Sequence, residues 1–247
     1  MPNLYRSALS ASLKPAPQDG RRAGASLACW VANMLLVALG MLGCSTVQTP
    51  SVVRAEPYEP TNFSVSRTFL NAEIVRVAVL PPTVPASLRQ SHAQVVESLQ
   101  QVFRSEVTKA KLFEVVWLDP EAMRSQVGLP VLNPDRPYPA HFFTSLNESL
   151  QCQAVLLPKL TSMRTISPMM MGWQIQLVDT QTVETIWEIN EVFDAGNPSV
   201  HAAAVAYFEQ QVQAGFRKPS PELVLASPSL YGQYTLDAML ATLPGRK

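Results

Sequence analysis

Residues able to do chemistry are few in this sequence, and they stand far apart. The three histidines, His92, His141 and His201, are each isolated, with no second histidine or cysteine at metal-ligand spacing. The chain has no Gly-x-Ser-x-Gly or Ser-x-x-Lys nucleophile motif and no glycine-rich phosphate loop. We therefore expect no catalytic residues, no metal site and no cofactor, and we interpret the protein as not an enzyme.

Two single residues with reactive side chains have structural interpretations. Asp179 begins the run Asp179-Thr180-Gln181-Thr182, and an aspartate that bonds nearby amides is typical of a turn. Cys152 precedes the apolar run 154–157, where a lone cysteine most often serves as a small core residue. Because Cys29 and Cys44 belong to the N-terminal region, no disulfide is expected in the mature chain.

The N-terminal region predicts export and attachment of lipid at Cys44. The first 22 residues carry four basic side chains and one acidic side chain, and residues 23–43 are uncharged and largely apolar. A basic segment, an apolar segment and a small residue before the cleavage point form a secretory signal. Met41, Leu42 and Gly43 resemble the bacterial lipobox, although that motif usually has leucine at the first position and a small residue at the second. We therefore expect a signal peptide over residues 1–43 and acyl chains such as palmitate on Cys44.

Three other interpretations of this segment stay open. Roughly 20 apolar residues can span a bilayer, so the segment could be an uncleaved transmembrane helix. An ordinary signal peptidase could cut it without addition of lipid, or Cys29 could be the lipid site. Ser45 follows Cys44, where an aspartate often retains a lipoprotein in the inner membrane. We therefore expect an outer-membrane lipoprotein of a bacterial cell envelope that faces the periplasm.

Composition limits the partners. The 247 residues include 19 basic and 19 acidic side chains, and loss of the signal would leave 15 basic and 18 acidic. No basic run or patch is present, so nucleic-acid binding has no electrostatic support. About 204 residues would remain, enough for one sizeable domain with tails. We divide them into a lipidated N-terminus and flexible tether at 44–70, an α/β domain at 71–215 and a C-terminal extension with a helix at 216–247.

Hydrophobic periodicity predicts the elements of the domain. Short β-branched or alternating runs indicate strands, and i, i+3, i+4 stripes indicate helices. The expected strands are 73–80, 113–118, 154–160, 171–177 and 187–193, with Pro158 marking a bulge or an edge. The expected helices are 91–110, a short one opened by Asp119 and Pro120, 140–150, one that starts at 197–199, and a last one with Ser227 as cap.

This order predicts an α/β fold with one mixed sheet. Alternating strands and helices place the first strands parallel, and the hairpin adds antiparallel strands to the same sheet. Helices would pack on the sheet, and an extra C-terminal helix would follow.

One apolar stretch has a second interpretation: Met169, Met170, Met171 and Trp173 could form a contact site for a partner, a second subunit or the lipid surface. The alternative is that two of the three methionines fill the core.

The pattern resembles a family of envelope lipoprotein domains. Its marks are the strand Arg76–Pro81 before a long helix, the strands 112–116 and 153–157, and a hairpin that turns at Asp179 and returns through Ile186-Trp187. Over roughly residues 73–213 it is similar to the curli-secretion-channel (CsgG-like) lipoproteins, the N-terminal domain of TolB, LpoB and PelC. The resemblance implies a fold that binds envelope partners or forms rings and has no catalytic residues. The sequence lacks the extra hairpins of the curli barrel.

We therefore interpret the chain as a non-enzymatic, lipid-anchored envelope protein. Its α/β domain would bind protein partners or assemble into a homo-oligomeric ring, in secretion, polymer export or cell-wall assembly. The membrane would be a partner through the N-terminal lipid. A solute- or polymer-binding lipoprotein is the alternative, and a lipid-anchored hydrolase is a weaker one.

Overall fold

The computed structural model describes residues 58–66, 70, 72–126, 138–213 and 220–245. Cys44, the predicted signal peptide and most of the predicted tether lie outside these residues. The described part contains one six-stranded sheet with the order β1-β6-β5-β4-β2-β3. Its strands are β1 (Phe63–Val65), β2 (Arg76–Val79), β3 (Glu114–Trp117), β4 (Ala154–Arg164), β5 (Met170–Asp179) and β6 (Thr185–Asp194).

Strand directions confirm the predicted mixed sheet. β2 pairs in parallel with both β3 and β4, as expected for strands joined by helical crossovers. β4, β5 and β6 then pair antiparallel in sequence. β4 is an interior strand, so Pro158 marks no sheet edge, and the shift in its pairing with β5 falls between Leu160 and Ser162. The α/β fold class predicted from the sequence is the one observed.

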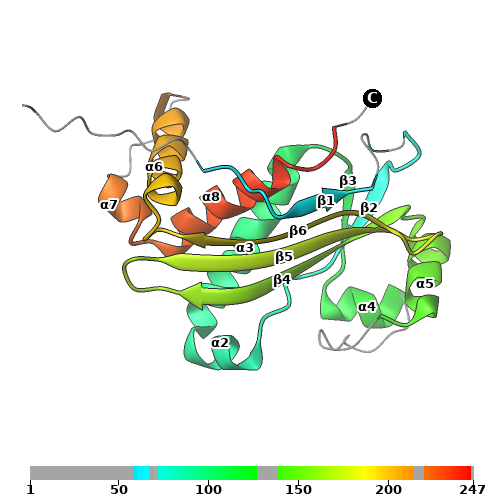
Figure 1. The fold of residues 1–247 in the computed structure, drawn as a ribbon. Helices are drawn as coiled ribbons and strands as arrows, with labels where there is room; N and C mark the ends of the chain where they lie inside the picture. The colour runs from blue at the N-terminus through cyan, green and yellow to red at the C-terminus, as the bar shows by residue number, and fades with distance from the viewer. Residues whose placement is uncertain (1–57, 67–69, 71, 127–137, 214–219, 246–247) are drawn as a thin grey trace, which may run out of the picture. The chain divides into compact units, whose positions relative to one another are not determined.

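Helices cover the sheet on two sides (Figure 1). They are α2 (Ala86–Ser91), α3 (Ala93–Ala110), α4 (Pro120–Gln126), α5 (Ala140–Leu150), α6 (Pro198–Gln213), α7 (Pro221–Val224) and α8 (Pro228–Leu240). Alternate residues of β2 point to opposite faces: Val77 and Val79 join the large core with α3 and α8, whereas Ala78 joins a smaller core with α5. Figure 1 shows α6 and α8 on one side of the sheet and α4 and α5 on the other.

Local capping follows the sequence closely. Asp119 Oδ1 accepts hydrogen bonds from the amides of Glu121 and Ala122 at 3.0 and 2.8 Å, which satisfies the first turn of α4. Ser227 Oγ accepts from the Leu230 amide at the start of α8, with Pro228 at the first helical position. These two helix starts confirm the predicted ones. No helix in the described part of the chain is long and apolar enough to cross a bilayer.

The predicted tether contains a strand of the sheet. β1 lies within the range 44–70, and Phe63, Ser64 and Val65 pair antiparallel with Ile189, Glu188 and Trp187. The upstream amides of Thr61 and Asn62 both donate to Glu191 Oε2. A three-residue strand shows no periodicity, so its partner in β6 decides its conformation. The fold therefore begins before residue 71.

The predicted C-terminal extension is part of the core. Tyr231, Leu236 and Met239 of α8 are fully buried among residues of the sheet and α3. The two helices approach closely at Gly232, where an added Cβ would lie 2.5 Å from Leu99 Cδ2. α8 therefore packs as a layer of the domain rather than as an addition to it.

Candidate functional site

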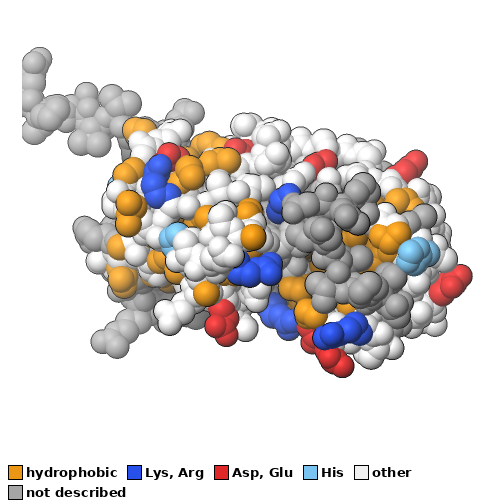
Figure 2. Space-filling view, turned by 90° about the horizontal axis from the view of Figure 1, so that it is seen from below, with side chains coloured by type: hydrophobic (Ala, Val, Ile, Leu, Met, Phe, Trp, Pro, Cys, Tyr) orange, Lys and Arg blue, Asp and Glu red, His pale blue; other side chains and the backbone are white. Residues whose placement is uncertain are grey.

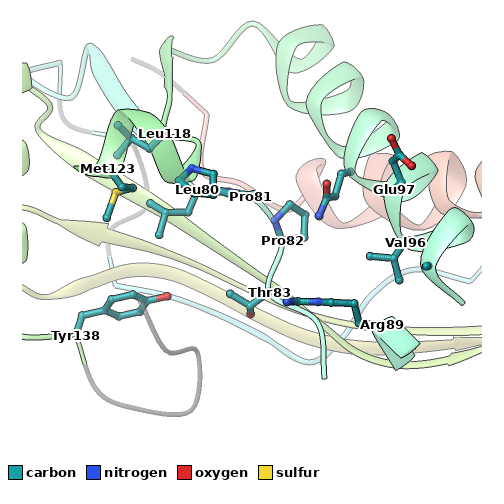
Figure 3. Close-up of a pocket in the computed structure, with 13 residues that line it drawn as sticks. Leu80, Pro81, Pro82, Thr83, Arg89, Val96, Glu97, Leu118, Met123 and Tyr138 are labelled. Carbon is teal, nitrogen blue, oxygen red and sulfur yellow. The ribbon is translucent and has the colours of Figure 1, made fainter. Parts of the chain in front are cut away.

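A pocket of about 480 Å³ opens at the carboxyl ends of β2 and β3. The chain leaves β2 toward α2 and α3 on one face of the sheet, and leaves β3 toward α4 and α5 on the other. Adjacent parallel strands whose connections part in this way leave a crevice, and ligands of α/β proteins bind in such crevices. We call this pocket the β2–β3 crevice (Figure 3).

The walls of the β2–β3 crevice are mainly apolar. Leu80, Val96, Leu118 and Met123 line it, together with Pro81, Pro82 and Pro120. The backbone here offers few donors, since the amides of Leu80, Thr83 and Leu118 already bond to Leu156, Pro158 and Val79, and proline has no N–H. The amides of these three residues are therefore not available to a ligand.

Polar side chains stand at the mouth of the crevice. They are Thr83, Arg89, Glu97, Gln100 and Tyr138. Figure 3 shows the Arg89 guanidinium and the Tyr138 hydroxyl extending toward Thr83 from opposite sides, whereas the Glu97 carboxylate is turned away from Thr83. Among the described residues no carboxylate forms an ion pair with Arg89, and the only hydrogen bond of its guanidinium is a long one of 3.5 Å to the Val84 carbonyl.

Tyr138 is held by aromatic packing. Its ring stacks on Phe142 with centroids 5.2 Å apart and an interplanar angle of 23°. Burial raises the pKa of the Tyr138 hydroxyl, so the group stays protonated and able to donate at neutral pH. Its hydroxyl has no partner among the described residues.

The reactive residue types do not converge on this crevice. His92 precedes α3 and its Nδ1 lies 2.6 Å from Ser91 Oγ, while His141 and His201 are exposed on α5 and α6. Within the described ranges no three histidine, cysteine or acidic side chains form a group that could hold a metal ion. Arg89 and Tyr138 are donors, and neither has a neighbouring base that would make it a nucleophile. Among the described residues, the lining of the crevice therefore contains no nucleophile with an adjacent base.

A second polar cluster joins three helices and resembles a catalytic arrangement. Lys109 Nζ of α3 lies 2.7 Å from Asp237 Oδ1 of α8, 3.2 Å from the Tyr207 hydroxyl of α6 and 3.1 Å from Glu106 Oε2. Burial alone would lower the pKa of Lys109, but the hydrogen bonds that its ammonium donates to Asp237, Tyr207 and Glu106 outweigh burial and raise that pKa. The ammonium therefore stays protonated and is no nucleophile, so the cluster fastens α3 to α6 and α8.

The predicted methionine contact site is mostly buried. Met169, Met171 and Trp173 are completely inaccessible, and the Trp173 indole donates to Thr235 Oγ1 at 3.2 Å. This burial corrects the prediction for these three side chains, because all three belong to the large core, where Met171 and Trp173 of β5 face α8. It matches the alternative that two of the methionines fill the core. Met170 is half-buried on the opposite face, and the contact prediction stays open only there.

The two single reactive residues have the expected structural roles. Asp179 Oδ1 accepts from the Gln181 and Thr182 amides at 2.8 and 3.1 Å, as in an aspartate turn. Cys152 is fully buried, and burial raises the pKa of its thiol to about 11. A protonated, inaccessible thiol is a poor nucleophile.

Sequence reasoning missed the β2–β3 crevice and the Lys109 cluster. A signal for the crevice was present, because Pro81-Pro82 and Asp119-Pro120 directly follow two predicted parallel strands. Those strand ends must meet at one sheet edge. Arg89 lies on α2 and Tyr138 lies just before α5, and both residues fall outside the elements expected from the sequence. No local pattern pointed to either residue.

The fold is thus a mixed α/β sheet with a crevice at its parallel end. No family model matches this chain, and no curated protein matches it. Among solved structures it is similar to the PelC dodecamer from Paraburkholderia phytofirmans, with a TM-score of 0.36, 11% identity, and coverage of 58% of this chain and 88% of PelC.

Two further structures are similar in the same way. For lipoprotein GNA1162 from Neisseria meningitidis, the TM-score is 0.35 at 13% identity, covering 58% of this chain and 99% of that one. For E. coli LpoB, the TM-score is 0.32 at 15% identity, covering 76% and 82%. PelC and LpoB were named in the sequence resemblance, whereas similarity to the curli channel and TolB stays a prediction. Identities of 11–15% and TM-scores of 0.32–0.36 establish no family, partner or activity for this chain.

Proposed function

We propose that this protein is a non-enzymatic lipoprotein of the bacterial envelope, anchored through Cys44, whose α/β domain binds protein partners or assembles with itself. The observation that supports the anchor is the sequence before the domain: a basic segment, an uncharged apolar segment, and Cys44 directly after Gly43. The protein would act at the periplasmic face of the outer membrane, in secretion, polymer export or cell-wall assembly. We also propose that the domain is related to the CsgG-like lipoproteins and to the N-terminal domain of TolB.

A sheet face left open by the helices supports the partner-binding role. α5 covers Val155, Leu157 and Val178 at one end of this face. Farther along β5 and β6 the face carries Gln174, Gln176, Glu188, Asn190 and Val192, and Val192 is 46% exposed. Figure 2, seen from below the view of Figure 1, shows a few basic and acidic side chains among hydrophobic and neutral ones, with no large patch of one charge. Such a neutral, mixed surface suits a protein partner better than a nucleic acid.

The lipid anchor is tested by substitution of each cysteine. Cells that express the wild-type chain, Cys44→Ser, Cys29→Ser or Cys152→Ser are labelled with an alkyne analogue of palmitate, and the protein is then fractionated. We expect label on the wild type and on the Cys29 and Cys152 variants, and none on Cys44→Ser. Label that persists in Cys44→Ser would overturn the anchor. An unlabelled wild type of full length would indicate an uncleaved helix, and an unlabelled, shortened one an ordinary signal peptidase.

Partner binding is tested on the open sheet face. A photoreactive amino acid replaces Asn190 on this face, and a matched control replaces Glu121, which is exposed on α4. We expect crosslinks in living cells from position 190, either to a second copy of this chain or to an envelope protein, and fewer from position 121. A strictly monomeric protein in native mass measurements, with no crosslinks from position 190, would contradict the proposal.

The β2–β3 crevice favours a second candidate function. A pocket of about 480 Å³ with apolar walls and a few polar groups falls within the roughly 300–1,000 Å³ typical of small-molecule sites. A solute-binding lipoprotein would carry such a pocket. This function and partner binding use different surfaces of the domain, so one protein can have both.

A further inference from the structure

We propose that the β2–β3 crevice binds an amphiphile with an apolar body and one terminal carboxylate. The inference rests on the second candidate function, solute binding, and gives it a ligand class. It does not depend on the lipid at Cys44 or on the open sheet face. Failure of either of those proposals therefore leaves it intact.

The apolar walls of the crevice favour an apolar body in the ligand. Leu80, Val96, Leu118 and Met123 come from four separate segments, and they converge on one space with no free backbone donor at Leu80, Thr83 or Leu118. A strongly hydrated ligand would lose water there without replacement hydrogen bonds, which is unfavourable. An aliphatic chain or apolar side chain would instead remove apolar surface from water.

The polar side chains at the mouth of the crevice favour a carboxylate on the ligand. Arg89, Thr83 and Tyr138 bring a guanidinium and two hydroxyls toward one point, as Figure 3 shows. The guanidinium is a fixed positive charge whose fork matches a carboxylate, and among the described residues no acid neutralises it. Glu97 is the one acid among the lining residues, and its carboxylate is turned away. An amine would meet Arg89 unfavourably.

The donor set suits a singly charged head group. The amides of Leu80 and Thr83 are used within the sheet, and the Thr83 hydroxyl donates to the Pro158 carbonyl at 3.4 Å. The Arg89 guanidinium and the Tyr138 hydroxyl are therefore the side-chain donors for the ligand, and a carboxylate can accept from both. Two sources carry such a head on an apolar body: a fatty acid and the C-terminal residue of an apolar peptide.

The test measures binding to the full-length protein in lipid nanodiscs, with empty nanodiscs as the baseline. Octanoate and acetyl-Leu-Leu represent the two sources. Octylamine carries the opposite charge, acetyl-Leu-Leu-amide lacks the charge, and inorganic phosphate lacks the apolar body. We expect saturable binding of at least one carboxylate, with the tighter one identifying the source, and no binding of the three controls. Equal binding of octylamine and octanoate would overturn the head-group assignment.

Three variants locate the site. Arg89→Met should weaken carboxylate binding about tenfold, as expected for loss of one charge-assisted hydrogen bond at an exposed position. Arg124→Met, an exposed arginine on α4 with the same change of charge, should leave binding unchanged. Ala93→Trp changes an exposed lining residue and should block the crevice while the domain keeps its near-ultraviolet circular dichroism. Wild-type binding by Ala93→Trp, or equal effects of the two arginine variants, would refute the proposal.

Discussion

Replacing Lys109 with methionine should destabilise the domain, because it leaves the buried Glu106 without its counter-charge. Removal of one partner from a fully buried ion pair costs about 3–5 kcal/mol, whereas exposed pairs contribute about 0–1 kcal/mol. The Glu106 side chain is 6% exposed, but those of Lys109 and Asp237 are 45% and 37% exposed. Solvent therefore screens much of the interaction. We expect a loss of about 1–2 kcal/mol in the free energy of unfolding at neutral pH, between those two limits.

The pH dependence identifies the cause. Burial raises the pKa of Glu106, and Lys109 partly offsets the rise. A carboxyl whose folded pKa is raised contributes stability below its unfolded pKa, near 4.5, and loses it as the pH rises through the folded value. Without Lys109, the pKa of Glu106 in the folded protein rises further. The loss caused by Lys109→Met should therefore be larger at about pH 7.5 than at about pH 4.5, where Glu106 takes up a proton.

The assay is urea unfolding of the full-length protein, followed by tryptophan fluorescence at both pH values. Arg124→Met serves as the control, because Arg124 and Glu121 form a solvent-exposed pair in α4 and the change should stay within about 0.5 kcal/mol. The double variant Glu106→Gln/Lys109→Met should recover part of the loss, since it leaves no buried charge. An equal loss at both pH values, or a loss no larger than that of Arg124→Met, would refute the reasoning.

Other parts of the domain give three further predictions. Gly172→Ala should destabilise by about 1–3 kcal/mol in urea unfolding, because its Cβ would lie 2.4 Å from Ser162 Oγ and 2.6 Å from Thr161 Oγ1. Gly245→Ala, with nothing within 4 Å of the new Cβ, is the neutral control, and equal effects would contradict the packing. Tyr231→Phe removes a buried hydroxyl without a hydrogen-bond partner in the described part of the chain, so the melting temperature should stay the same or rise. A fall of several degrees would show that the hydroxyl has a partner. Cys152, with a thiol pKa of about 11, should react with iodoacetamide at least tenfold more slowly in the folded than in the urea-unfolded protein, and equal rates would contradict its burial.

Elements with strong periodicity were predictable, and short ones were not. The stripe of α3 and the alternation of Trp173 and Ile175 in β5 identified their elements because each buries one face. β1 and α2 have three and six residues and no such pattern, so tertiary contacts decide their conformations. The same limit applies to Met169–Met171. A local run of methionines suits a surface or a core equally, and only the pairing with β4 and β6 shows which face each one takes.

By itself, the sequence determined features that depend on residues close together in the chain. It specified the order of the longer strands and helices through their periodicity. It also specified the caps at Asp119 and Ser227 and the turn at Asp179, because these depend on hydrogen bonds within a few residues. The expectation of a lipid on Cys44 also comes from the sequence alone. Tertiary structure decided what depends on distant residues meeting. Lys109 reaches Asp237 across 128 positions, and the β2–β3 crevice brings together side chains from Leu80 to Tyr138. No local pattern encodes such contacts, since they arise only when the sheet and its helices pack.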